Sequence, residues 1–124
     1  MLDVAAPTMD DVGRRKVLAL LGLGVRGRLV VVGAERVRLE ALKGALQLAV
    51  VATDVSRHSL DKVVPALRAR HVEMIEWPSS AELGGAVGRD TTAAVGIVDQ
   101  ALARGIRGAV AGAAPAGDAT RVSR

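Results

Sequence analysis

The sequence contains no cysteine, no phenylalanine and no tyrosine, and Trp77 is its only large aromatic residue. The lack of cysteine excludes disulfides, thiolate nucleophiles and zinc–thiolate sites. The lack of aromatic side chains excludes the base-stacking platforms on which many single-strand RNA modules rely. The core must therefore consist of valine, leucine, isoleucine and alanine, which favours thin layers of helix on sheet.

Long hydrophobic runs are also missing. The longest apolar stretch, residues 17–25, is well short of the about 20 residues that cross a bilayer. Residues 1–13 carry Asp3, Asp10 and Asp11, and this charge is opposite to that of a signal peptide. We therefore expect a cytoplasmic protein without a membrane partner.

The length of 124 residues fits one domain with a single core. From residue 108 onward alanine, glycine and proline dominate without periodicity, which is typical of disorder. We expect a frayed N-terminus at residues 1–9, one domain at residues 10–107 and a disordered tail at residues 108–124.

The charge is basic, with 17 Lys and Arg against 13 Asp and Glu, a net charge of +4 and a pI near 10.6. Most of the basic residues are arginines, whose forked guanidinium groups bind phosphate through two hydrogen bonds and stack on bases. This bias favours a nucleic-acid partner. Arginine codon usage in a GC-rich genome explains the same bias, so composition alone leaves both explanations open.

Strand and helix patterns alternate along the chain. We predict strands at residues 29–32, 48–52, 72–76 and 95–98, and helices at residues 10–24, 33–43, 56–70, from 79 onward and 100–104. The continuous apolar run at 48–52 indicates a central strand buried on both faces, and Pro65 is expected to kink the third helix or split it. The predicted fold is an α/β class, three-layer α/β/α sandwich around a small mixed sheet.

The glycines at residues 22–27 match the dinucleotide-binding pattern G-x-G-x-x-G. In such a site a strand precedes the glycines, a helix follows them, and an acidic residue lies about 20 positions later. Here a predicted helix precedes, a predicted strand follows, and the acidic residue is missing. We interpret the pattern as a glycine-rich helix exit.

Signals for catalysis or metal binding are weak. His58 and His71 have no partner at metal-ligand spacing, and no serine-nucleophile, P-loop or zinc-protease motif occurs. The carboxylates near them lie scattered over predicted caps and strand edges and form no acid/base pair: Asp54, Asp61, Glu73 and Glu76. We predict no enzyme activity, no catalytic residue, no cofactor, no metal and no small-molecule substrate.

Two local features allow a functional or a structural interpretation. Trp77, before Pro78, is either a stacking side chain or a lid over one end of the aliphatic core, and we favour the lid. The turn at Gly33 joins a strand to a helix whose first amides and positive end would bind phosphate, with arginines nearby in sequence; an ordinary strand-to-helix corner explains it equally.

Several motifs, in order, resemble the L7Ae family of small RNA-binding proteins. V-R-G-R-L-V at 25–30 is similar to R-A-G-R/K-L-V, and the helix between Gly33 and Gly44 has the family's length, with Val37 in register. L-A-V-V-A-T-D-V at 48–55 is similar to L-V-V-I-A-E-D-V, and Pro65 falls where members carry a proline. W-P-S at 77–79 and the segment 79–88 resemble V-P-S-x-x-E-L-G-x-A-x-G. The ending V-G-I-V-D at 95–99 most resembles the bacterial YlxQ subgroup.

This resemblance, which covers about residues 14–105, implies an L30e-like fold and non-enzymatic binding of structured RNA, typically a kink-turn, in association with ribosomes or transcription. In the family, the start of the second helix meets tandem sheared G·A pairs, and the loop before the last strand covers splayed bases. Carried over by position, the implied RNA-binding residues are Arg28, Gly33, Ala34, Glu35, Arg36 and Arg38, and Arg89, Asp90, Thr91, Thr92 and Ala93.

The sequence departs from the strong kink-turn binders at these positions. Those proteins have Asn-Glu in place of Glu35 and Arg36, a lysine in place of Leu39, and an apolar loop in place of Arg-Asp-Thr-Thr at 89–92. The departures leave two alternatives: a protein-interaction module that has lost kink-turn recognition, and the substrate-recognition domain of an RNA-modifying enzyme.

Overall fold

The computed structural model describes residues 11–111, in which five helices and four strands alternate strictly along the chain. The helices are α1 (Asp11–Arg26), α2 (Ala34–Leu42), α3 (Arg57–Ala69), α4 (Ser80–Ala86) and α5 (Gln100–Ala111). The strands are β1 (Val30–Val32), β2 (Leu48–Ala52), β3 (Met74–Trp77) and β4 (Ala94–Ile97). The predicted α/β class is confirmed.

The four strands form one mixed sheet in the order β1-β4-β2-β3. β2 pairs in parallel with β3 and antiparallel with β4, and β4 pairs antiparallel with β1. All five residues of β2 are buried, which confirms it as a central strand. β1 and β3 are the two edges of the sheet.

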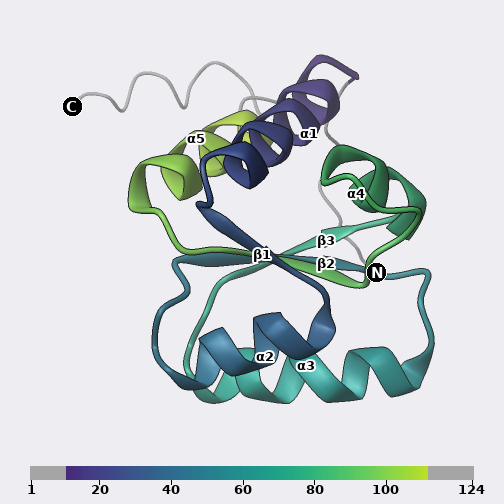
Figure 1. The fold of residues 1–124 in the computed structure, drawn as a ribbon, viewed down its shortest axis with the longest axis vertical. Helices are drawn as coiled ribbons and strands as arrows, with labels where there is room; N and C mark the ends of the chain where they lie inside the picture. Colours follow the sequence, from purple (N-terminus) through teal and green to yellow (C-terminus); the bar gives the residue numbers. More distant parts are fainter. Residues whose placement is uncertain (1–10, 112–124) are drawn as a thin grey trace.

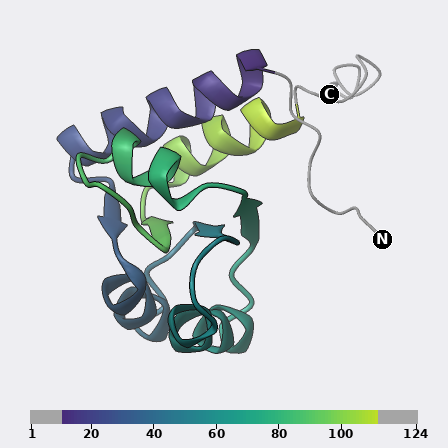
Figure 2. The ribbon, with the colours of Figure 1, turned by 90° about the vertical axis from the view of Figure 1, so that its right-hand side faces the viewer.

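Helices cover both faces of the sheet and make the predicted three layers (Figure 1). α1, α4 and α5 lie on one face, and α2 and α3 lie on the other. Figure 2 shows α1 and α5 side by side above the sheet, with α2 and α3 seen nearly end-on beneath it. Each face of the sheet buries its own cluster of aliphatic side chains, as the shortage of aromatic residues requires.

The largest difference from the sequence prediction is at the last helix. α5 continues to Ala111, whereas we predicted a helix ending at residue 104 and disorder from 108. Ile106 and Ala109 extend the buried stripe of α5, so packing against α1 stabilises a segment whose glycines and alanines conceal the helical pattern. The expected frayed residues 1–9 and the rest of the expected tail, 112–124, lie outside the described residues.

Two smaller differences concern the third helix and the third strand. Pro65 lies inside α3, which runs without a break from Arg57 to Ala69. β3 begins two residues later than predicted and includes Trp77. The Trp77 side chain is buried, as is that of Ile75 two positions earlier. Trp77 is therefore the last residue of β3 that faces the core.

Candidate nucleic-acid interface

The structure brings the two predicted RNA-binding segments together at the β1 edge of the sheet. Val32, the last residue of β1, pairs with Val95 in β4. The next residue continues this contact, because the Gly33 N–H donates to the carbonyl of Ala94 at 2.8 Å. The start of α2 therefore lies beside the 88–93 loop, which enters β4, although more than fifty residues separate them in the sequence.

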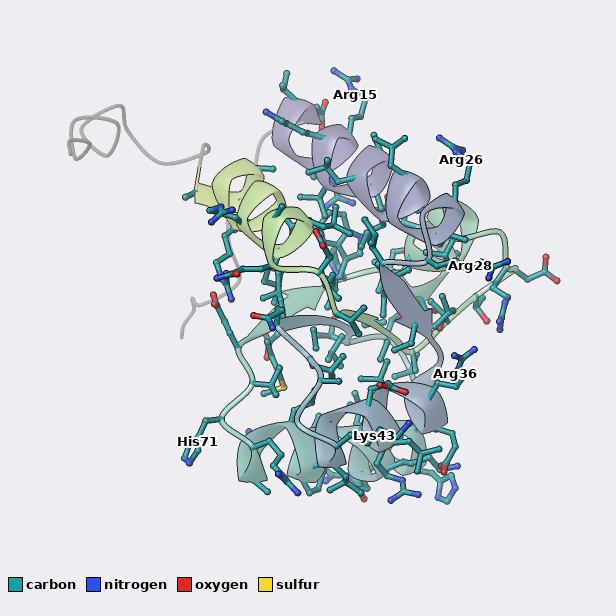
Figure 3. All side chains as sticks on the ribbon, turned by 60° about the vertical axis from the view of Figure 1, so that its left-hand side comes forward. Arg15, Arg26, Arg28, Arg36, Lys43 and His71 are labelled. Atoms are coloured by element: carbon teal, nitrogen blue, oxygen red, sulfur yellow. The ribbon has the colours of Figure 1, made fainter. Side chains whose placement is uncertain are left out.

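A groove of about 520 Å³ follows this edge of the sheet. Its charged walls are Arg28, Arg36 and Arg89, and its other lining residues are valines at positions 25, 30, 31, 32 and 87. Within the described part of the chain, no acidic side chain forms an ion pair with any of these guanidinium groups. Figure 3 shows Arg28 and Arg36 projecting from the same side of the molecule. An anion in the groove would meet three cations without displacing an internal partner.

Gly33 forms the turn that opens α2 beside the groove. Its backbone has φ 103° and ψ 148°, a region that is essentially limited to glycine. Glycine has no side chain to accept a hydrogen bond from the first turn, and the structure shows no side-chain cap there. Within the part of the chain that the structure describes, the amides of Ala34, Glu35 and Arg36 are therefore free of a side-chain acceptor at the positive end of the helix.

Arg38 is less available than its neighbours. Its Nη2 lies 2.8 Å from Oε2 of Glu35, one turn earlier on α2. This hydrogen bond from Arg38 lowers the pKa of Glu35 below its usual value. Glu35 and Arg38 thus neutralise each other, and Arg36 remains as the free cation of the pair of arginines predicted on α2.

The 88–93 loop presents some of its predicted residues and buries another. Arg89, Asp90 and Thr91 are exposed, whereas Thr92 is only 7% exposed. The Thr92 hydroxyl donates to the carbonyl of Ala94 at 3.2 Å, and its N–H donates to that of Ser80 at 3.1 Å. Thr92 therefore anchors the loop, and Ala93 likewise accepts a bond from the Ala52 N–H at 2.8 Å.

α4 supports the back of this loop through Gly84. A Cβ atom at Gly84 would lie 2.5 Å from Cα of Thr91 and 2.8 Å from the carbonyl carbon of Asp90. The loop backbone also donates to this glycine, from the Arg89 N–H to the Gly84 carbonyl at 2.7 Å. Only a residue without a side chain allows the loop to lie this close to the helix.

Trp77 is fully buried, as the predicted lid over the core requires. Its Nε1–H donates to Oε1 of Glu82 at 3.0 Å, and Arg14 lies over the ring with its Cζ 5.1 Å from the centroid. Arg14 also donates to Glu82. These contacts connect α1, β3 and α4, and they make Trp77 unavailable for stacking on a base.

Other patterns in the sequence have structural roles. Gly22 and Gly24 lie inside α1, so the glycine-rich pattern has the helix-to-strand order that argues against a dinucleotide site. Among residues 11–111, no group of three or more histidines, aspartates and glutamates could hold a metal ion. In that same range no helix has the length and apolar character needed to cross a membrane.

Sequence reasoning missed part of this surface. Val25 and Val87 line the groove, but nothing in their sequence context distinguishes them from core valines. Arg26 projects beside Arg28, and Arg15 projects from the same helix further along (Figure 3). Arg26 is among the arginines that lie near the Gly33 turn in the sequence, and the signal for Arg15 is its eleven-residue spacing from Arg26, which places both on one face of a helix.

The architecture and the groove define a small three-layer α/β/α protein with a basic cleft at one sheet edge. The chain belongs to the ribosomal protein L7Ae/L30e/S12e/Gadd45 family, whose sequence profile matches residues 15–105. This match confirms the family that the motifs indicated.

Solved structures show the same fold. A protein with unknown function from Bacillus halodurans C superimposes with a TM-score of 0.70 at 24% identity, covering 77% of this chain and 96% of the other. A Giardia lamblia 15.5kD RNA binding protein superimposes with a TM-score of 0.68 at 19% identity, covering 90% and 97% of the two chains. No curated protein matches the chain significantly.

Proposed function

We propose that this protein binds structured RNA of the kink-turn type and catalyses no reaction. The observation that carries the proposal is the convergence of Arg28, Arg36 and Arg89 on one groove, each without an ion-pair partner among the described residues. Membership of the L7Ae/L30e family and the fold shared with the Giardia RNA-binding protein support it.

In the proposed complex, Arg36 and Arg28 bind phosphates from two sides of the groove, and the uncapped amides of α2 bind a third oxygen. Arg89, Asp90 and Thr91 lie against an unstacked base on the loop side. Thr92 and Ala93 hold the loop in place. Of the residues first expected to touch RNA, Arg38 acts through Glu35, because its hydrogen bond fixes the Glu35 carboxylate in the first turn of α2.

The proposal includes a cytoplasmic location, an association with ribosomes or the transcription machinery, and a place near the YlxQ subgroup. The association rests on the family resemblance of the motifs, the subgroup on the ending at 95–99, and the cytoplasmic location on the short apolar runs of the sequence. Purification of the tagged protein from its own cells, with and without nuclease treatment, tests the association. RNA-dependent recovery of ribosomal or transcription components supports it, and recovery of neither contradicts it.

RNA specificity is tested by titrating the protein against a kink-turn RNA and a matched straight duplex, each at low and at physiological salt. Tight binding with preference for the kink supports kink-turn recognition despite Glu35, Arg36 and Leu39. Equal binding to both RNAs that disappears at physiological salt is typical of nonspecific phosphate contact and contradicts it.

A second candidate function is docking of a protein partner on α2. Leu39 and Leu42 are 44% and 40% exposed, and their three-residue spacing places them on one face of the helix. Leu39 also stands where the strong kink-turn binders carry a lysine. RNA binding that survives a Leu39→Lys and Leu42→Lys double substitution, together with loss of a copurified protein, would favour this second function.

A further inference from the structure

The outer face of α1 carries a line of cations that the predicted RNA site does not include. Arg15 and Arg26 are exposed and eleven residues apart, which corresponds to about 16 Å along the helix axis and about 20° around it. Figure 3 shows Arg15 projecting from the far end of α1, at the top of the view, and Arg26, Arg28 and Arg36 following one another down one side of the molecule. The line therefore leads from α1 directly to the groove.

Two observations indicate that these cations face an external partner. After Asp11, α1 contains no acidic residue. In the described residues 11–111, neither Arg15 nor Arg26 forms an ion pair, whereas the adjacent Arg14 turns inward to Glu82. The helix thus separates its arginines into one that connects elements of the fold and two that remain in solvent.

We propose that the α1 track, defined as Arg15 and Arg26, binds the phosphates of an RNA stem that continues from the structure held in the groove. This inference rests on the proposed function and extends the footprint by the length of α1. A line of point charges in one direction matches the regular phosphates of a duplex, since a double helix presents phosphates repeatedly along its axis. Such contacts position the RNA and carry no sequence information.

The test uses two RNA hairpins with the same kink-turn, one with a short stem and one with the stem lengthened by a full helical turn. We expect the wild-type protein to bind the long stem more tightly. In the Arg15→Gln, Arg26→Gln double variant this gain is lost, a change on the order of tenfold, and the dependence of log affinity on log salt flattens by about two units, close to one for each phosphate contact. Binding to the short stem is unchanged.

A matched control removes two arginines from the opposite side of the molecule. Arg68 and Arg70 are exposed near the end of α3, next to His71, which projects away from the α1 track (Figure 3). Arg68→Gln with Arg70→Gln lowers the net charge equally and should keep the gain from the longer stem. The charge-retaining variant Arg15→Lys with Arg26→Lys should keep most of it, which separates lost charge from altered folding.

The remaining outcomes overturn the inference. Wild-type binding that depends on Arg36 but not on stem length would leave the proposed function intact and remove the track. An equal loss in the Arg68 and Arg70 control would show a net-charge effect without a defined track. Failure of the wild-type protein to bind either hairpin would overturn the proposed function together with this inference.

Discussion

The beginnings of α4 and α2 lie on opposite faces of the sheet and are finished in opposite ways. At α4, the Ser79 hydroxyl accepts from the Glu82 N–H at 3.0 Å, and the Asp54 carboxylate accepts from the Ser80 N–H at 2.8 Å. At α2, the N-cap is Gly33, and among residues 11–111 no side chain accepts from the first turn. Side-chain oxygens of the protein accept hydrogen bonds from the first amides of α4, whereas among the described residues none accepts from the first amides of α2.

This comparison separates stability from binding. A serine or aspartate cap typically stabilises a helix by about 1 kcal/mol, and α3, α4 and α5 each receive a side-chain oxygen from Ser56, Ser79 or Asp99. α2 forgoes this contribution at the place where Arg28, Arg36 and Arg89 also lack ion-pair partners in the described structure. Donors and cations left unpaired together are a better guide to a ligand surface than either feature alone.

The largest expected effect comes from a substitution in α4 that displaces the loop carrying Arg89. We expect Gly84→Ala to destabilise the protein by about 1–3 kcal/mol, because its methyl group would overlap the backbone of Thr91 and Asp90. RNA affinity should fall as well, since the loop that carries Arg89 must move. Urea unfolding and RNA titration measure the two effects.

Gly85→Ala is the matched control, because a Cβ atom at Gly85 would meet no atom within 4 Å. Alanine there should stabilise α4 by roughly 0.5–1 kcal/mol through its higher helix propensity and leave RNA binding unchanged. Equal effects of the two substitutions would contradict the close approach of loop and helix.

A smaller effect is expected at the uncapped start of α2. Arg36→Ala should weaken RNA binding by on the order of 1 kcal/mol and flatten the salt dependence by about one unit. Arg38→Ala should have a smaller effect, because Glu35 already pairs with Arg38. Titrations at several salt concentrations measure both, and an unchanged salt dependence in the Arg36 variant would remove this residue from the interface.

The smallest expected effect concerns the pH dependence of stability, through Glu82 in the first turn of α4. The hydrogen bond from Arg14 lowers the pKa of Glu82, with a smaller contribution from Trp77 and opposition from partial burial. A lowered folded-state pKa contributes stability above the unfolded value of 4.5, and this stability is lost as the pH falls through the folded-state value. Glu82→Gln should therefore reduce the loss of stability between neutral and acidic pH.

Unfolding midpoints at pH 7 and pH 3 measure this change, with Glu76→Gln as the control, because Glu76 is exposed and has no ion pair in the described chain. The same acid sensitivity in wild-type and Glu82→Gln proteins would show that the contacts of Glu82 do not depend on its charge.

Local patterns in the sequence predicted the layers, whereas both segments of the candidate site were proposed from the family resemblance. The apolar run at β2 and the serine cap of α4 are each contained in a few neighbouring residues, and both are confirmed. The predicted end of α5 at residue 104 was wrong, because Ile106 and Ala109 become part of the core only through packing on the rest of the fold.

The details of the site depended on contacts that no local pattern contains. The burial of Thr92 follows from its bond to Ser80 on α4, and the pairing of Arg38 with Glu35 selects one of two similar arginines on α2. The groove itself exists because β4 places the 88–93 loop next to Gly33. Sequence spacing identified the candidates, and tertiary contacts decide which of them remain free.

The burial of Trp77 gives the protein a spectroscopic probe of the contacts among α1, β3 and α4. Indole emission depends on solvent contact, and without phenylalanine or tyrosine the near-ultraviolet signal comes from this one residue. Emission therefore reports whether the α1, β3 and α4 cluster is intact. Ligand binding in the groove near Arg36 that leaves this cluster unchanged also leaves the emission unchanged. A spectral shift on adding RNA would mean that the bound RNA disturbs this cluster, either through the loop packed on Gly84 or through α1, which carries Arg14.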